Sequence, residues 1–421
     1  MKIINDAIHG QFKLEGATEE LLATPEINKL SHIKQLGLAH LVFPGAHHTR
    51  FEHSMGASHI AGMMAESVGL NKQDKSTLEV AAMLHDVGHG PYSHTLEHIL
   101  SERGGMDHMS VTEGIILGDY DVLIEGEGDS IDERDSIPDI LERNDLDPEE
   151  VASLIRGPDA SGKERSLINW TEGMSDFSGE DKTMAHLIHG SVDCDQLDFL
   201  LRDSHFTGVK HGVVDLHPLV GSLGSQGGDV VVDQGGLSAL EGMLLARGLM
   251  YSAVYFHRVT RVTEVMLSRA VERAGGSLPD SVDLQRRVDS EIWGALSDLK
   301  ICLSRRMEDL SEDQKQLLVS LSNDSESRRV LEEELALRSG LEPGYVAIDV
   351  PSVKLLLSEP RMSQVDVRVA GDDGKTRWLR EITPMADALK NRHVSQEAVY
   401  VMTLPGSESK VAEVAERHLF S

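Results

Sequence analysis

Three histidines and one aspartate stand within the segment AAMLHDVGHGPYSH, residues 81–94. The pair His85-Asp86 follows an apolar run, and burial of an unpaired imidazole and carboxylate at such a place is costly. Neutral imidazole and ionised carboxylate are also the nitrogen and oxygen ligands of divalent metal ions. An isolated His-Asp pair favours a capped helix end with solvated histidines, so a metal centre requires further ligands elsewhere in the chain.

Two other segments supply residues of the same kinds. The segment FPGAHHTRFEHSMG, residues 43–56, contains Arg50 and His53, and the segment SVDCDQLDFLLRD, residues 191–203, contains Asp195. These segments add histidines and aspartates to the His85-Asp86 pair, and both residue types are ligands of divalent ions. The combination therefore favours a metal centre.

This order of residues resembles the HD phosphohydrolase superfamily. Residues 2–10, 24–56, 85–94 and 195–209 resemble, in the same order, the deoxynucleoside triphosphate (dNTP) triphosphohydrolases, which include the vertebrate SAM-and-HD-domain enzyme and bacterial relatives. The similarity runs through residues 1–260. It implies a metal-dependent enzyme that attacks the α-phosphorus of a dNTP and releases a deoxynucleoside and triphosphate.

The resemblance implies that the metal ligands are His53, His85, Asp86 and Asp195. Two imidazoles and two carboxylates leave positions on a six-coordinate ion for water and a phosphate oxygen. Such an ion lowers the pKa of the water and polarises the phosphorus. We expect a divalent cofactor and leave its identity open among Mn, Fe, Mg, Co, Ni and Zn.

Catalytic roles follow from the same resemblance. Arg50, three residues before His53, would share a helix face with it and grip a phosphate, although pairing with an acid such as Glu52 is an alternative. The remaining expected catalytic residues are His94 as general acid, Glu97 as its orienting carboxylate, and His89 and His108 as donors to the phosphates.

Seven further residues match substrate-binding positions of the family: Gln35, Leu36, Phe199, Asp203, Arg247, Tyr255 and Arg258. Gln35 and Asp203 would bind the sugar 3′-hydroxyl, and Leu36 and Phe199 would exclude a 2′-hydroxyl. The last three would lie near base, sugar or phosphate, and an ordinary amphipathic helix explains their segment equally well.

The chain also departs from the family. Gln196 replaces a lysine that grips the triphosphate in the vertebrate enzyme, and Met109 replaces a glutamate usual in relatives. Where the vertebrate effector site reads guanine with an Asp, a Gln and an Arg, this chain has Ala23, Asn28 and Ser31. A short amide and a hydroxyl cannot replace a carboxylate and a guanidinium fork. We therefore expect no vertebrate-style activation by GTP; another nucleotide effector, or none, would serve.

Composition bounds the partners. The chain carries 70 Asp and Glu against 40 Lys and Arg, a net charge of −30, which disfavours nucleic acid and anionic membranes as partners. Two cysteines, Cys194 and Cys302, suit a reducing compartment. With no signal-peptide layout and no membrane-spanning apolar run, we expect a cytoplasmic protein. The resemblance implies a homo-oligomer, either a dimer or a tetramer.

The expected fold class is mainly α, with an HD-domain helical body and a small C-terminal α+β extension. We place the HD domain at residues 1–335, including an acidic, partly loop-like segment at 119–182, and the α+β domain at 336–421. Helical spacing predicts a helix after Thr18 and helices over 54–68, 237–271 and 284–318, with a further helix from Pro148. Strands are predicted at 345–350, 365–369 and 398–403, with a hairpin turn at 371–374.

Other functions of HD domains use similar residues. Guanosine tetraphosphate hydrolases typically carry a Glu-Asp soon after the HD pair, where this chain has Val87-Gly88-His89, and the Gly-Tyr-Pro signature of cyclic dinucleotide phosphodiesterases is missing from the sequence. An HD-family nucleotidase or phosphatase that acts on another phosphorylated nucleotide stays open, as does a nucleotide-binding regulator with weak activity.

Overall fold

The computed structural model describes residues 1–92, 95–96, 107–120, 135–157, 179–274, 289, 300–306, 309–350, 365–390 and 398–420. The chain folds into two compact units. The first comprises Met1–Val254, Pro279–Ile292 and Pro360–Arg392, and the second comprises Tyr255–Leu278, Trp293–Glu359 and His393–Ser421. The chain therefore passes between the units several times, and the boundary expected between residues 335 and 336 falls inside the second unit.

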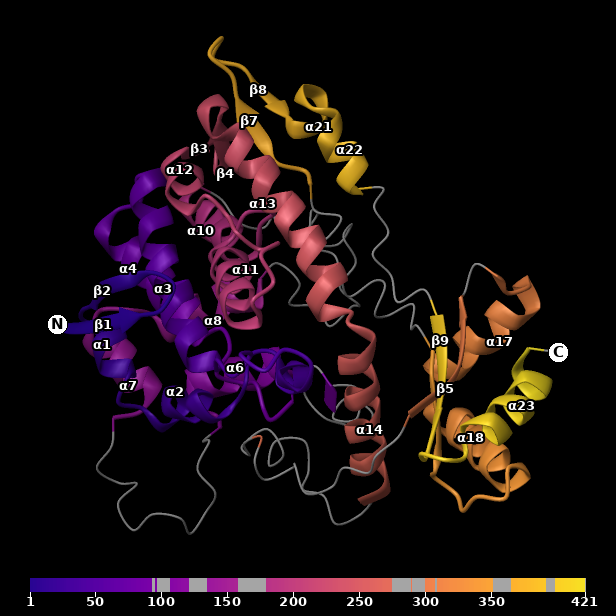
Figure 1. The fold of residues 1–421 in the computed structure, drawn as a ribbon. Coiled ribbons are helices and arrows are strands. Elements are labelled where there is room, and N and C mark those ends of the chain that lie inside the picture. The colour runs from indigo at the N-terminus through magenta and orange to yellow at the C-terminus, as the bar shows by residue number, and fades with distance from the viewer. Residues whose placement is uncertain are drawn as a thin grey trace. The chain divides into compact units, whose positions relative to one another are not determined.

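The described part of the first unit is mainly helical, which confirms the expected fold class (Figure 1). Its α-helices are α1 (Ala17–Leu21), α2 (Pro25–Lys29), α3 (Arg50–Val68), α4 (Lys72–Leu84), α6 (His108–Leu117), α7 (Ile137–Arg143), α8 (Pro148–Arg156), α10 (Gly179–His189), α11 (Cys194–Thr207), α12 (Leu216–Gly221), α13 (Leu237–Met250), α21 (Leu379–Ile382) and α22 (Pro384–Lys390). Short 3-10 turns lie at Leu30–His32, Gly37–Leu41 and Gln234–Gly236.

Three helices position the residues singled out by the sequence. Helix α3 packs against both α4 and α11. It begins with a capping box in which Glu52 accepts a 2.6 Å hydrogen bond from the backbone N–H of Thr49. Helix α4 begins where the Asn71 side chain caps two backbone N–H groups and ends at Leu84, immediately before His85. Asp193 caps α11, which places Asp195 in its first turn.

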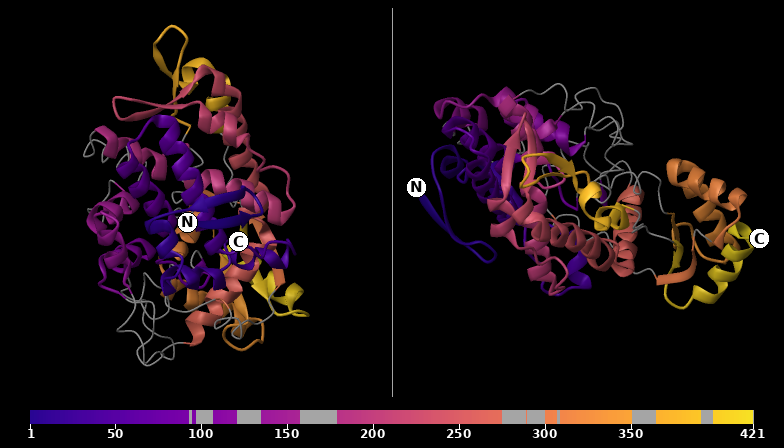
Figure 2. Two further views of the ribbon diagram at one scale, coloured as in Figure 1. Left: turned by 90° about the vertical axis from the view of Figure 1, so that its left-hand side faces the viewer. Right: turned by 90° about the horizontal axis from the view of Figure 1, so that it is seen from above.

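Two small sheets complete the first unit. Strands β1 (Lys2–Asp6) and β2 (Gly10–Leu14) form an antiparallel hairpin next to the N-terminus (Figure 2). The second sheet has the order β3-β4-β7-β8, made of β3 (Leu223–Gln226), β4 (Asp229–Asp233), β7 (Arg368–Ala370) and β8 (Thr376–Trp378). The β7–β8 pair confirms the predicted hairpin turn, whereas β1 to β4 were missed because strands of four or five residues give little alternation.

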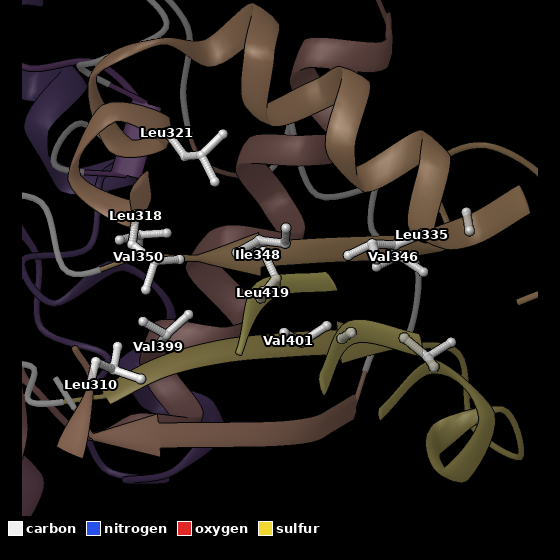
Figure 3. Close-up of a cluster of buried hydrophobic side chains, with 13 residues drawn as sticks. Leu310, Leu318, Leu321, Leu335, Val346, Ile348, Val350, Val399, Val401 and Leu419 are labelled. Atoms are coloured by element: carbon white, nitrogen blue, oxygen red, sulfur yellow. The ribbon is translucent and has the colours of Figure 1, made fainter. Parts of the chain in front are cut away.

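The second unit combines helices and a sheet. Its described helices are α14 (Arg258–Ala274), α17 (Glu312–Asn323), α18 (Ser325–Arg338) and α23 (Glu408–Leu419). Its antiparallel sheet has the order β5 (Lys300–Arg306), β9 (Ala398–Thr403), β6 (Val346–Asp349). Figure 3 shows the apolar cluster between this sheet and its helices, where Val346, Ile348 and Val401 lie among leucines such as Leu335.

Several predicted helices are interrupted. The segment after Thr18 forms two short helices, because the extended Thr24 and the following Pro25 begin a new helix rather than continue the old one. The helix expected over 237–271 changes to a π-helical stretch at Tyr251–Tyr255 before α14 begins. The helix expected over 284–318 is wrong over Lys300–Arg306, which forms strand β5, whereas the described Asp289 is helical and the end of the range belongs to α17.

No helix in the described ranges is long and apolar enough to span a membrane.

Candidate metal centre

Four side chains from α3, the turn after α4 and α11 converge at one point in the first unit. Nε2 of His53 lies 3.1 Å from Oδ1 of Asp195 and 4.0 Å from Oδ2 of Asp86. Nε2 of His85 lies 3.3 Å from Oδ1 of Asp86 and 3.9 Å from Oδ1 of Asp195. Ligand atoms of His53, His85 and Asp86 all fall within 4.8 Å of one another. These are the four residues expected as metal ligands.

Both histidines present the same ring nitrogen to this point. Nδ1 of His53 donates to Oδ2 of Asp198 at 2.8 Å, and Nδ1 of His85 donates to the carbonyl oxygen of Ala82 at 2.7 Å. A hydrogen bond at Nδ1 fixes the tautomer and leaves Nε2 as the ligand atom, which is the usual arrangement around metal-binding histidines. The donor set of two imidazoles and two carboxylates therefore fits a divalent ion.

Exposure differs across the cluster. The side chains of His53 and Asp86 are 1% and 6% exposed, whereas those of His85 and Asp195 are 16% and 18% exposed. A substrate would therefore approach the ion from the His85 and Asp195 side.

The charges at the centre perturb its pKa values. Burial opposes protonation of His53, but hydrogen bonds to Asp195 and Asp198 outweigh burial and raise its pKa to about 10. Burial likewise opposes ionisation of Asp86, yet the charge of Arg50, together with His85 and a hydrogen bond from His89, holds its pKa well below the usual range. Without metal, the site thus holds an ionised Asp86 and a protonated imidazole, and a metal ion competes with that proton.

Arg50 lies beside the ligands. Its side chain is 3% exposed, and NH1 lies 2.6 Å from Oδ2 of Asp86. Glu52, the alternative partner of Arg50 in the sequence analysis, instead accepts a hydrogen bond from the backbone N–H of Thr49 at the start of α3. The arginine thus pairs with an acid, namely the carboxylate of Asp86, which is one of the candidate ligands.

Two of the expected histidines are brought together next to this pair. The rings of His89 and His108 stack with centroids 4.1 Å apart, and Nε2 of His89 lies 3.3 Å from Oδ1 of Asp86. Burial, Arg50 and His108 lower the pKa of His89 well below its usual value, so this ring is neutral and can donate one hydrogen bond. His94 and Glu97 lie outside the described residues.

Lys29 carries a partly buried amine near the centre that the sequence motifs did not indicate. Its Nζ donates to the carbonyl oxygen of Val87 at 3.2 Å, directly after the His-Asp pair. Burial, reinforced by Arg50, lowers its pKa to about 7. No motif marked this lysine, because its proximity depends on how α2 packs beside the turn after α4.

The turn after the His-Asp pair is held by helix α6. Backbone N–H of Gly88 donates to Oγ1 of Thr112 at 3.0 Å, and a side chain at Gly88 would overlap the carbonyl oxygen of His108. A glycine is therefore required where α6 crosses this turn.

A second polar cluster contains the residues expected at the sugar. Nε2 of His48 lies 2.7 Å from Oδ1 of Asp203, and the backbone N–H of Gln35 donates to the carbonyl of His48 at 3.1 Å. Oε1 of Gln35 is buried and has no hydrogen-bond partner among the described residues. The structure thus links Gln35 to Asp203 through His48, a histidine for which the sequence predicted no role.

Arg247 lies away from solvent. It is 1% exposed and its NH1 donates to Oε1 of Gln196 at 2.6 Å, while Gln196 in turn binds Asp193 and the carbonyl of Gly190. Leu36 and Phe199 are half-buried in the first unit. Tyr255 and Arg258 belong to the second unit.

Two known protein families match parts of this chain. The HD domain family matches residues 50–156, and a family described as the HD associated region matches residues 214–420. The chain belongs to the HD-domain phosphohydrolases. Metal dependence is a property of such domains, and the His53, His85 and Asp86 cluster is placed to hold the ion.

This HD phosphohydrolase is similar in sequence to two known proteins and in structure to a third. It is 28% identical to an uncharacterized protein of Methanocaldococcus jannaschii, over 100% of this chain and 82% of the relative. It is 31% identical to the deoxynucleoside triphosphate triphosphohydrolase SAMHD1 of Homo sapiens, over 50% of this chain and 34% of the relative. A crystal structure of a hypothetical protein from Aquifex aeolicus superposes with a TM-score of 0.69 at 26% identity, over 98% of this chain and 99% of that chain.

Coverage differs between these relatives. The HD phosphohydrolase spans about a third of the length of the human enzyme but nearly the whole of the Aquifex aeolicus chain. The substrate of this chain therefore requires its own argument.

Proposed function

We propose that this HD phosphohydrolase hydrolyses deoxynucleoside triphosphates to a deoxynucleoside and triphosphate. The observation that carries the proposal is the convergence of His53, His85, Asp86 and Asp195 on one point, with Arg50 beside it. Similarity to enzymes named deoxynucleoside triphosphate triphosphohydrolases, from Xenopus laevis to Homo sapiens, supports the choice of substrate.

Different residues of the chain would serve different parts of the reaction. A divalent ion held by the four ligands would lower the pKa of a water molecule and polarise the α-phosphorus. Arg50, His89 and His108 would bind the phosphate oxygens, on which negative charge accumulates during phosphoryl transfer. His94, oriented by Glu97, would give a proton to the departing sugar oxygen.

The sugar end would be read by the second polar cluster. The carboxylate of Asp203, already oriented by His48, would accept the hydrogen bond of the 3′-hydroxyl, and the side-chain amide of Gln35 would donate an N–H to the oxygen of the same hydroxyl. Leu36 and the ring of Phe199 would fill the space next to C2′ and disfavour a 2′-hydroxyl. Arg247, Tyr255 and Arg258 are proposed to contact base, sugar or phosphate; the first would have to release Gln196 to do so.

Product analysis tests this proposal. Each dNTP and NTP is incubated with the full chain under Mn²⁺, Mg²⁺, Fe²⁺ or Co²⁺, and products are separated by anion exchange. We expect deoxynucleoside and triphosphate in equal amounts from dNTPs, and NTP hydrolysis slower by about 100-fold, the discrimination typical of a pocket that must exclude one hydroxyl. Release of phosphate or pyrophosphate would contradict cleavage of the bond between the α-phosphorus and the sugar 5′-oxygen.

One observation favours a second function, hydrolysis of another phosphorylated nucleotide by an HD-family nucleotidase or phosphatase. Gln196 stands where the vertebrate enzyme carries a triphosphate-binding lysine, and its side chain is buried and bound to Asp193, Gly190 and Arg247. It therefore supplies no cation to a triphosphate. Phosphate as the product from nucleoside monophosphates would support this alternative.

Regulation is proposed to differ from that of the vertebrate enzyme. The side chain of Asn28 donates to the carbonyls of Leu22 and Thr24, and Ser31 donates to the carbonyl of Asn28, so both serve local backbone groups instead of a guanine edge. We expect GTP to change the initial rate of dATP hydrolysis by less than about fivefold, the low end of allosteric coupling. Stronger stimulation would contradict this expectation.

We also propose that the chain forms a homo-oligomer, either a dimer or a tetramer.

A further inference from the structure

Asp198 is a buried carboxylate next to the candidate metal ligands that accepts four hydrogen bonds. It accepts hydrogen bonds from Nδ1 of His53 (2.8 Å), from Nε2 of His9 (2.6 Å), and from Nε and NH2 of Arg202 (2.8 Å each). A carboxylate offers about four lone-pair sites, so these four donors fix its orientation. The side chain is completely buried, and no solvent can replace a lost donor.

Two of the groups around Asp198 come from the N-terminal hairpin. His9 lies in the turn between β1 and β2, and Asp6 ends β1. Asp6 accepts hydrogen bonds from the backbone N–H groups of Ile8 and His9 (2.8 and 2.9 Å), and from NH1 of Arg202 (2.8 Å). Asp6 thus shapes the turn that carries His9, and Arg202 binds both Asp6 and Asp198.

Close packing makes this arrangement possible. A side chain at Gly56, three residues after His53 on α3, would overlap the carboxylate of Asp198 and the guanidinium of Arg202. The side chains of His9 and Arg202 are 3% and 0% exposed. The turn of the hairpin therefore belongs to the same buried polar network as His53, the candidate metal ligand.

We propose that His9 is a positioning residue for the metal centre: through Asp198 it fixes the ring orientation in which His53 presents Nε2 to the ion. Removal of the group that binds a ligating histidine at its other ring nitrogen typically changes metal affinity by about 10–100-fold, and His9 acts through such a group, Asp198. The inference rests on the metal site of the proposed function, and it is independent of which nucleotide is hydrolysed.

The competing explanation is packing. The ring of His9 lies 5.7 Å from that of His59, which stacks on Phe12 of β2 at 4.4 Å. If the ring only held the hairpin in place, its shape would matter and its hydrogen bond would not. Two substitutions separate these roles: His9→Phe keeps an aromatic ring and removes the donor, whereas His9→Gln removes the ring and keeps an N–H donor at similar reach.

The experiment measures metal binding without substrate. Full-length protein is freed of metal with a chelator and titrated with Mn²⁺ by calorimetry, and its Co²⁺ complex is recorded by absorption spectroscopy. We expect His9→Gln to bind Mn²⁺ with nearly the wild-type affinity. We expect His9→Phe to bind about 10–100-fold more weakly and to alter the Co²⁺ spectrum, because the orientation of one imidazole ligand changes.

Two further variants keep the test decisive. Gln11→Ala removes an exposed hydrogen bond to Asn5 on the same hairpin and should leave Mn²⁺ affinity unchanged. His9→Asn carries the same amide as His9→Gln one methylene shorter, cannot reach Asp198, and should behave like His9→Phe even if the latter fails to fold. Circular dichroism of the metal-free proteins checks the fold.

Each outcome bears on one claim. Wild-type Mn²⁺ affinity in His9→Phe together with weaker affinity in His9→Gln would show that the ring acts by packing, and would overturn the inference. The inference would also be overturned if Gln11→Ala weakened Mn²⁺ binding as much as His9→Phe, or if all variants bound Mn²⁺ equally well. Wild-type protein that binds neither Mn²⁺ nor Co²⁺ would instead contradict the metal centre of the proposed function.

Discussion

Replacement of Asp195 with alanine is expected to abolish both metal binding and hydrolysis while the helical fold survives. Asp195 lies in the first turn of α11, and its Oδ1 lies 3.1 Å from Nε2 of His53 and 3.9 Å from Nε2 of His85. Loss of an outer partner already costs about 10–100-fold, so loss of a direct ligand should cost more than about 100-fold in Mn²⁺ affinity. Calorimetry and product release measure the two effects.

The fold should survive because the Asp195 side chain is partly exposed and caps no helix. The cap of α11 is Asp193, whose side chain accepts from the backbone N–H of Gln196. His85→Ala should give the same loss. As a matched control, Asp147→Ala removes the exposed cap of α8, should cost about 1 kcal/mol of unfolding free energy, and should leave metal binding unchanged. Undiminished turnover in Asp195→Ala or His85→Ala would refute the site.

The sequence points to the candidate ligands through the family resemblance, and each of them lies in a short motif next to a recognisable helix end. His85-Asp86 follows the apolar end of α4, and His53 follows a capped helix start. Such signals are local, since caps and helical periodicity depend on neighbours within a few residues. The same holds for the helix predicted from Pro148, which the structure confirms as α8 with Asp147 as its cap.

The support around the ligands could not be predicted in this way. His9 reaches Asp198 across 189 residues of sequence, and Lys29 reaches Val87 across 58. Neither residue lies in a motif that specifies its partner, because both contacts depend on tertiary packing. Gln196 shows the converse: its motif suggests a lost phosphate contact, whereas the structure gives it a buried role beside Arg247.

Secondary structure failed where the local signal was ambiguous. Lys300–Arg306 alternates weakly, and it forms a strand because β9 pairs along its length. In the N-terminal hairpin only Phe12 and Leu14 are buried among the residues of both strands, which leaves too short a pattern to distinguish from a loop. These elements are specified by their partners rather than by their own periodicity.

Arg50→Gln is expected to lower the stability of the metal-free protein more than that of the metal-bound protein. In the structure NH1 of Arg50 lies 2.6 Å from Oδ2 of Asp86, and both side chains are buried. Removal of one partner of a buried ion pair costs about 3–5 kcal/mol because the other charge is left uncompensated. A bound divalent ion would compensate Asp86 instead, so urea unfolding with excess Mn²⁺ should show a much smaller loss than unfolding with chelator.

Activity at saturating Mn²⁺ then separates the two roles of Arg50. If the arginine only oriented Asp86, excess metal would restore turnover. Because we propose that it also binds phosphate, kcat/KM should stay lower by about 10²–10³-fold, the cost of removing one preorganised donor to developing charge. Arg50→Lys keeps the charge but not the planar fork and should lie between the two. Full recovery of Arg50→Gln at high Mn²⁺ would restrict the arginine to its ion pair with Asp86.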